Sequence, residues 1–220
     1  MAIAVVSTAN SSNSEFDRHD IVMPDYIEAG NMLVAFFTCN GSGESVEIDR
    51  TLSGFNWNIL DEYVSSLANT AVCYCKIADG NDTLRINTGS NVTSTAIVYN
   101  LSGISNTTPV VSEGYANSSN ANPTSVTTAS GTHEYIFVVY AGITGTVIAS
   151  AAPTSFVNLI TQQSDINGSS SSAAHRLYTT TGSYDPGPFT SSAANYVVFT
   201  VCIAPSGAAG IGITSLFYQS

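Results

Sequence analysis

The sequence predicts an all-β protein, an antiparallel and jelly-roll-like β-sandwich with an internally duplicated strand order and a short C-terminal tail. Three observations predict this class. Short runs rich in Val, Ile, Thr, Tyr and Phe are separated by turn-forming Gly, Asn, Asp and Ser. Long helical periodicity is nearly absent. Two stretches of the chain also repeat each other strand by strand. With 220 residues, 44% of them apolar, the chain can bury a substantial core.

Each expected strand is a short apolar or alternating run bounded by turn residues. Asn40-Gly41 and Asp79-Gly80 supply residues that tolerate the positive φ angles of tight turns. Pro186, Gly187 and Pro188 interrupt any strand in their region. The expected strands are 3–8, 19–23, 32–39, 45–49, 56–63, 70–78, 83–87, 93–101, 124–128, 134–141, 146–150, 156–163, 172–180 and 195–203.

The internal repeat links four successive strands of one half to four of the other, with an offset near 102 that stays within a few residues. The matched segments are 30–37 with 131–140, 53–60 with 154–159, 71–80 with 173–182, and 95–101 with 197–203. The third match aligns Cys73 with His175. Two copies are too few for a solenoid. We therefore expect the two halves to form one interleaved sandwich domain. The alternative is that each half forms a small sandwich of its own. The expected domain spans 1–205, with pseudo-repeats at about 12–103 and 115–205, a link at about 104–123 and an apolar tail at 206–220.

The charge balance limits the classes of partner. Five basic residues against 16 acidic ones give a net charge of −11, which excludes a nucleic-acid binder or an anionic-membrane binder. No apolar run is long enough to span a bilayer. Ala2–Val6 is too short for a signal peptide and no basic residue precedes it, so we expect a first strand there.

The four cysteines (Cys39, Cys73, Cys75 and Cys202) include no C-x-x-C pair. Cys73 and Cys75 are two apart, so in a strand they share a face and are poorly placed to bond each other. We expect buried, reduced thiols in a chain made in a reducing cytoplasm, rather than disulfides or a metal site.

Histidines and carboxylates are the residues with possible chemistry. Asp17, His19 and Asp20 invite a metal-site interpretation, against the solvated polar turn that we expect. Because His175 aligns with a cysteine, we expect it to be a packing residue. Carboxylates that could form a glycosidase pair lie on or beside one expected strand (Glu44, Glu47 and Asp49) and at the end of another (Asp61 and Glu62), although acidic residues near turns are usually solvated.

Two further features have competing interpretations. Asp79-Gly80-Asn81-Asp82 resembles a calcium-tolerant turn or a plain β-turn. Trp57 is placed for burial under the sheet rather than for stacking on a sugar ring. We expect no catalytic residue, no cofactor and no metal.

Four strings give the chain a resemblance to a known group of proteins. They are Glu28–Ala35 (EAGNMLVA), Ser53–Leu60 (SGFNWNIL), Cys75–Gly80 (CKIADG) and Val98–Gly103 (VYNLSG). They resemble a bacteriophage-encoded family of β-sandwich, virion-associated proteins with the recurring strings AGDLLVA, SGWTLLD, YKIADG and VYRISG. The chain departs from this pattern at Phe55-Asn56-Trp57, where the tryptophan is displaced, and at Asn100, where the family usually has Arg.

The resemblance implies a non-enzymatic virion structural protein on the particle surface, assembled in the host cytoplasm. Capsid decoration or cementing is the narrower expectation. The expected partners are the major capsid protein or other virion subunits and further copies of the chain, with a trimer favoured. The alternative is a tail-fibre or receptor- or carbohydrate-binding module, and a third option is a depolymerase that uses Glu47 or Asp61.

The tail either folds back over the core or docks on another chain. The residues expected to dock on a partner are its large apolar and aromatic ones: Ile211, Ile213, Leu216, Phe217 and Tyr218.

Overall fold

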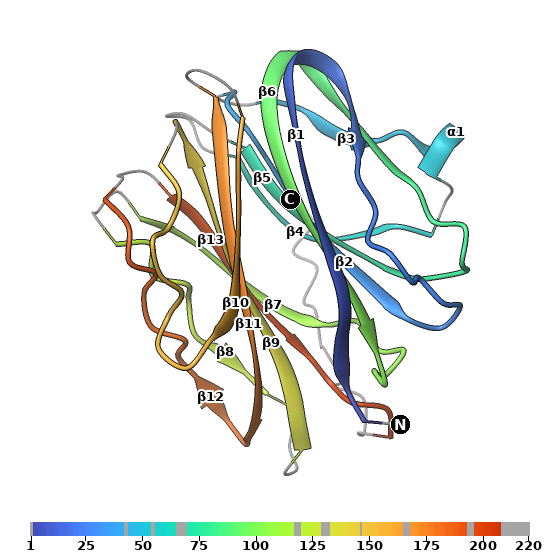
Figure 1. Cartoon of the computed structure of the whole chain (residues 1–220), viewed down its shortest axis with the longest axis vertical. Helices are drawn as coiled ribbons and strands as arrows, with labels where there is room; N and C mark the ends of the chain where they lie inside the picture. Colours follow the sequence, from blue (N-terminus) through green and yellow to red (C-terminus); the bar gives the residue numbers. More distant parts are fainter. Residues whose placement is uncertain are drawn as a thin grey trace, which may run out of the picture.

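Two antiparallel β-sheets face each other in this protein, seen here in a computed structural model (Figure 1). The sandwich and the duplicated strand order are confirmed. The structure describes residues 2–41, 44–53, 56–64, 70–116, 120–128, 133–145, 147–164, 168–192 and 196–207. Within this part of the chain, the only helix is the short α1 (Arg50–Ser53). None of its helices is long and apolar enough to cross a membrane.

The first half of the chain forms the first sheet, with strand order β1-β6-β2-β5-β4. A short strand, β3, pairs with the first part of β6. The bounds are β1 Ala4–Ile21, β2 Met32–Cys39, β3 Val46–Ile48, β4 Asn58–Val64, β5 Thr70–Ile77 and β6 Leu84–Ser102.

The second half forms the second sheet, with order β10-β11-β9-β13-β7, and the short strands β8 and β12 pair with each other. The bounds are β7 Val110–Ala116, β8 Val126–Thr127, β9 His133–Thr144, β10 Val157–Gln163, β11 Ser169–Thr180, β12 Ser183–Tyr184 and β13 Tyr196–Ile203. Each half therefore completes its own sheet, and the halves are not interleaved strand by strand. We describe the fold as a two-sheet sandwich, without the jelly-roll qualification.

The two sheets repeat one strand order: β1, β6, β2, β5 and β4 correspond to β7, β13, β9, β11 and β10. One row of paired residues shows the register. Phe36 pairs with Cys73 and Ile97 in the first sheet, and Tyr140 pairs with Ala173 and Phe199 in the second. The separations between corresponding residues of these rows are 104, 100 and 102. All three separations are even numbers. Because side chains alternate between the two faces of a strand, separations that differ from one another only by even numbers keep corresponding residues on the same face.

This register corrects the alignment of one strand pair. β4 and β10 both carry a bulge, after which Asp61 pairs with Cys73 and Ile160 with Ala173. His175 therefore corresponds to Cys75 and not to Cys73. The sequence alignment of this strand pair is wrong by two residues. Because side chains in a strand alternate with a period of two, a shift by two residues keeps the same apolar pattern.

Other strand predictions are corrected as well. The strands predicted at 3–8 and 19–23 are the two ends of one continuous strand, β1. The strands predicted at 83–87 and 93–101 likewise belong to one strand, β6, which pairs with β1 along its length. β7 lies inside the segment for which the sequence predicts a link. Residues 147–150 form no strand.

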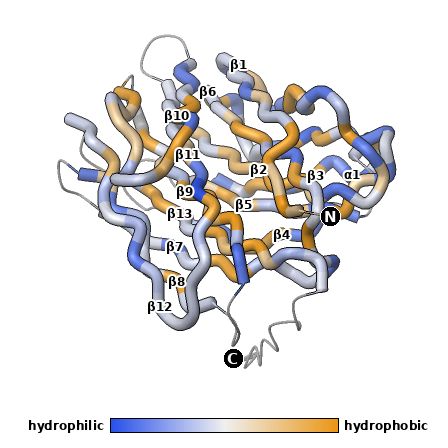
Figure 2. The backbone as a smooth tube through the Cα atoms, turned by 60° about the horizontal axis from the view of Figure 1, so that its bottom comes forward, coloured by the Kyte–Doolittle hydropathy of each residue, from blue (hydrophilic) through white to orange (hydrophobic). Residues whose placement is uncertain are grey.

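The main core fills the space between the sheets. It contains Met32, Val34 and Phe36 of β2 opposite Ile136, Val138 and Tyr140 of β9. The rings of Phe36 and Tyr140 stack at 4.6 Å between centroids. Figure 2 shows the hydrophobic residues of β2, β5, β9 and β13 gathered in the centre. Loops and short strands cover the outer face of each sheet over a second and a third apolar cluster.

One end of the inter-sheet core is polar. The Tyr140 hydroxyl lies 2.6 Å from both Thr38 Oγ1 of the first sheet and Ser171 Oγ of the second. Thr95 Oγ1 lies 2.6 Å from Ser171 Oγ. Beside this network, a Cβ added at Gly142 would lie 2.1 Å from Thr38 Oγ1. The two sheets are in close contact here, and a side chain larger than that of glycine would overlap Thr38.

Candidate functional site

The two edge strands β1 and β10, one from each sheet, meet along one side of the sandwich. At one end they are joined: Asn10 Nδ2 donates to the Thr161 carbonyl at 3.2 Å, and Gln162 Nε2 donates to Ser12 Oγ at 3.1 Å. At the other end they separate. The side of the sandwich is therefore closed at one end and open at the other.

Backbone irregularities lie in both strands beside the opening. β1 shifts register between Val5 and Ser7, and β10 shifts between Val157 and Ile160. Asn158, inside the β10 bulge, has a φ of 52°, and Ser155 just before the strand has a φ of 69°. Left-handed conformations are unfavourable for residues other than glycine, and such strained positions are often found at functional sites.

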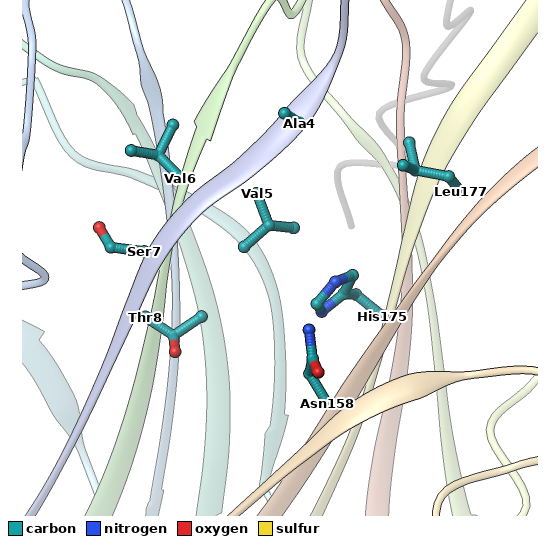
Figure 3. A pocket seen from close by; sticks show the side chains of 8 residues that line it. All are labelled: Ala4, Val5, Val6, Ser7, Thr8, Asn158, His175 and Leu177. Atoms are coloured by element: carbon teal, nitrogen blue, oxygen red, sulfur yellow. The ribbon is translucent and has the colours of Figure 1, made fainter.

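The hollow between the strands has a volume of about 420 Å³, and we call it the β1 groove (Figure 3). Its lining contains no Asp, Glu, Lys or Arg, and the only ionisable side chain among the lining residues is the imidazole of His175. Two of its lining side chains are exposed aliphatic ones, Val6 at 41% and Leu177 at 44% exposure, and Val157, next to the lining residue Asn158, is 53% exposed. The groove is lined by Ala4, Val5, Val6, Ser7, Thr8, Asn158, His175 and Leu177.

His175 forms the inner wall of the groove. It is buried, and its ring packs edge-on against Tyr99 at 5.8 Å. Burial lowers the pKa of this imidazole, which keeps it neutral at physiological pH. Among the described residues, neither His175 Nδ1 nor the Tyr99 hydroxyl has a hydrogen-bond partner. The expected packing role of His175 fits its burial.

A second hollow, of about 400 Å³, lies on the other side of Val6 and is also lined by Tyr26, Gly30 and Gly103. Tyr26 is 81% exposed and has a φ of 57°. The two hollows share Val6, so a hollowed surface of mixed polarity continues from Leu177 past the start of β1 to Tyr26, with Glu28 as the one carboxylate residue in its lining.

Asn100 attaches the Tyr26 loop to the sheet. The residue is fully buried, and its side-chain Nδ2 donates to the carbonyls of Asp25 and Tyr26 at 3.2 and 3.0 Å. Its Oδ1 accepts from Asn31 Nδ2 at 2.8 Å. The asparagine that replaces the expected arginine thus positions one wall of the second hollow.

Substitution of Asn100 by leucine is predicted to lower the free energy of unfolding by about 2 to 3 kcal/mol, because buried carbonyls lose their donors. Amide hydrogen exchange in residues 25–31 should accelerate in the same variant. Urea titration and exchange mass spectrometry measure the two effects. The matched control is Asn58→Leu at an exposed position. A loss at Asn100 no larger than at Asn58 would contradict the anchoring role.

The predicted docking residues Ile211, Ile213, Leu216, Phe217 and Tyr218 all lie outside the described residues. The last described residue, Gly207, is beside the start of β1. Ser206 N–H donates to the Gly103 carbonyl at 2.8 Å, and a Cβ on Gly103 would lie 2.2 Å from the Ala2 carbonyl oxygen.

The prediction of a solvated turn at His19 is wrong, because this residue is fully buried. Its Nδ1 lies 2.8 Å from Ser94 Oγ, and its Nε2 lies 3.2 Å from Thr88 Oγ1. Both ring nitrogens therefore have protein partners. Within the described part of the chain, no group of three His, Cys, Asp or Glu side chains is placed to hold a metal ion.

Burial lowers the pKa of His19 to about 4, and the nearby Asp17 carboxylate opposes this only in part. The unfolded state, with a pKa of about 6.5, therefore binds an extra proton between these values. Stability is thus predicted to fall by about 2 kcal/mol as the pH drops from 6.5 to 4.5.

The measurement is urea unfolding across this pH range, compared with His19→Gln. The comparison is needed because burial raises the pKa of Asp61, Glu62 and Glu113, which gives the opposite pH dependence. Equal slopes for the two proteins would contradict the assignment to His19.

The Asp79–Asp82 turn contains an internal cation. Lys76 Nζ lies 2.6 Å from Asp82 Oδ1 and 3.2 Å from Asp79 Oδ2. Asp82 also accepts the backbone N–H groups of Asp79 and Gly80. The lysine ammonium thus lies where the calcium interpretation would put a metal ion.

The carboxylates considered for a glycosidase include residues on separate strands of the first sheet. Asp61, in β4, pairs with Cys73 of the inter-sheet core. Glu47, in β3, pairs with Asn87 of β6. The structure does place Asp61 close enough to Glu113 of β7 to help raise the pKa of Glu113, a proximity that the sequence did not reveal.

Two packing predictions are confirmed. Trp57 is buried, and its Nε1–H donates to the Thr83 carbonyl at 2.9 Å. All four cysteines are buried and free. Burial raises the pKa of Cys39 and of Cys202 to about 12, so these thiols stay protonated.

The fold and site thus define an antiparallel β-sandwich with a mostly uncharged groove along one edge. Comparison with known proteins finds no matching family model, no matching curated protein and no matching solved structure.

Proposed function

We propose that this protein is a structural component of a bacteriophage particle, located on the virion surface, where it decorates or cements the capsid. The observation that carries the proposal is the groove at the start of β1, which exposed Val6 and Leu177 line together with no Asp, Glu, Lys or Arg. In a chain with a net charge of −11, a groove without these charged residues is suited to contact with another polypeptide.

The architecture supports a contact role. Loops and short strands of the chain itself cover the outer faces of both sheets, so the strand edges are the surfaces left for a partner. Edge strands present backbone groups that pair readily with an added segment. The partners in this proposal are the major capsid protein or neighbouring virion subunits, and further copies of this chain, with a trimer favoured.

The tail supplies a docking segment in this proposal, because it contains apolar residues and no charged side chain. Deletion of residues 208–220 leaves every described strand in place. We expect the truncated protein to fold but to be lost from particles. Circular dichroism checks the fold, and quantitative mass spectrometry of purified particles measures incorporation. Full occupancy by the truncated protein would contradict the docking role.

A carbohydrate- or receptor-binding module is the second candidate, and the exposure of Tyr26 favours it, since an aromatic side chain beside a hollow can stack on a sugar ring. A glycan array separates the candidates. Specific glycan binding that Tyr26→Ala abolishes would support the module, whereas no binding together with a fixed ratio to the coat subunit would support the capsid role.

A further inference from the structure

We propose that in the free protein the β1 groove holds the chain's own C-terminal segment, residues 211–218, along the outer edge of β1. This inference deepens the docking role proposed for the tail, because it names the surface on which the segment lies before assembly.

The position of the chain end is the first argument. Ile104 and Pro205 form an antiparallel bridge, and Ser206 is bonded to Gly103. Gly103 in turn contacts Ala2, two residues before β1 begins. Figure 1 shows the red end of β13 near the N-terminus. The segment after Gly207 therefore starts beside the second hollow, which Gly103 lines, and beside the groove.

Length and turn chemistry are the second argument. Extended chain spans about 3.3 to 3.6 Å per residue, so the eight residues 211–218 are longer than the stretch of β1 from Ala4 to Thr8. Gly207 has a φ of 86°, a left-handed conformation suited to a change of direction. Gly210 precedes Ile211, the first large apolar residue of the segment, and glycine adds conformational freedom for a change of chain direction.

Chemical match is the third argument. Ile211 and Ile213 are two apart, so on an added strand both side chains share one face. Val6, Val157 and Leu177 offer exposed aliphatic surface to such a face. β1 is the last strand of its sheet, so its outer edge is open to β-augmentation where β10 has diverged.

Covalent attachment is the fourth argument. It favours the chain's own C-terminal segment over that of a second copy as the occupant of the groove. A segment attached a few residues away has an effective concentration of about millimolar, far above that of a second copy in dilute solution. The intramolecular contact is therefore favoured in the isolated protein.

Photo-crosslinking in the full-length protein tests this directly. Val6 is replaced by benzoylphenylalanine, and equal amounts of normal and 15N-labelled protein are mixed, irradiated, digested with chymotrypsin and analysed by mass spectrometry. We expect crosslinks from position 6 to peptides within 208–220, with both partners carrying the same isotope. The matched control is benzoylphenylalanine at Val64, equally exposed on the opposite edge strand β4, which should crosslink to this segment at least about tenfold less.

Crosslinks between normal and labelled chains would overturn the proposal in favour of a second copy as the occupant. Absence of crosslinks to 208–220 would overturn it as well. As an independent check, the Ile211→Asp, Ile213→Asp variant should exchange the amides of residues 5–8 about tenfold faster, with no change at Val138. Both assays use isolated protein, so their failure is distinguishable from failure of particle incorporation.

Discussion

Replacement of Lys76 by methionine should lower the free energy of unfolding by about 3 to 5 kcal/mol, because it leaves a buried carboxylate without its cation. The side chains of Lys76 and Asp82 are 4% and 0% exposed, and their charged atoms are 2.6 Å apart. Methionine keeps most of the aliphatic length of lysine, so lost packing contributes little. Urea unfolding at pH 7 provides the measurement.

The rescue variant is Lys76→Met with Asp82→Asn. An asparagine at position 82 carries no charge, so more than half of the lost stability should return. An exposed ion pair contributes less than about 1 kcal/mol to the free energy of unfolding. The contradicting result would be a loss this small in the Lys76→Met variant. That result would show that the turn does not depend on its internal cation.

Replacement of Gly142 by alanine should lower the free energy of unfolding by about 2 to 3 kcal/mol, since the added methyl group overlaps an atom of the facing sheet. The new Cβ would lie 2.1 Å from Thr38 Oγ1, and Thr38 is bonded to Tyr140. The sheets must therefore separate or the polar network must break. Thermal and urea unfolding both detect the loss.

Thr38→Ala removes the hydroxyl and the methyl group that the new side chain meets, so the double variant Thr38→Ala, Gly142→Ala should be more stable than the sum of the single effects predicts. Gly89→Ala is the matched glycine control, because its Cβ would be 3.3 Å from the flexible Glu44 carboxylate. Equal costs at Gly89 and Gly142 would contradict the close contact between the sheets.

Much of the fold follows from local sequence. The strand predicted at 32–39 has the same bounds as β2, since an unbroken apolar run between turn signals has few alternatives. Burial of Trp57 and of the cysteines was predictable for the same reason. The repeat in the sequence indicated the duplicated strand order because corresponding strands keep their facing residues.

The errors have physical causes. Residues 10–15 of β1 and residues 88–91 of β6, which lie between the separately predicted strands, are all polar or glycine, so neither stretch shows apolar alternation. β7 is an edge strand of mixed polarity. His19 stands between charged residues, although strand alternation turns its side chain inward while Asp20 remains outside and bonds Arg85.

The β1 groove could not be found from the sequence. Its walls come from residues 4–8 and from Asn158, His175 and Leu177, which lie in the other half of the chain. Two register shifts lie beside the opening, and no local sequence pattern predicts them. A left-handed Asn158 is a backbone property visible only in three dimensions.

The copy number of this chain on purified particles tests the central claim, a structural role at the virion surface, most directly. Quantitative mass spectrometry against isotope-labelled standard peptides gives the ratio of this chain to the main coat subunit. The account predicts a fixed, stoichiometric ratio that survives high-salt washing. Absence of the chain from intact particles would contradict it.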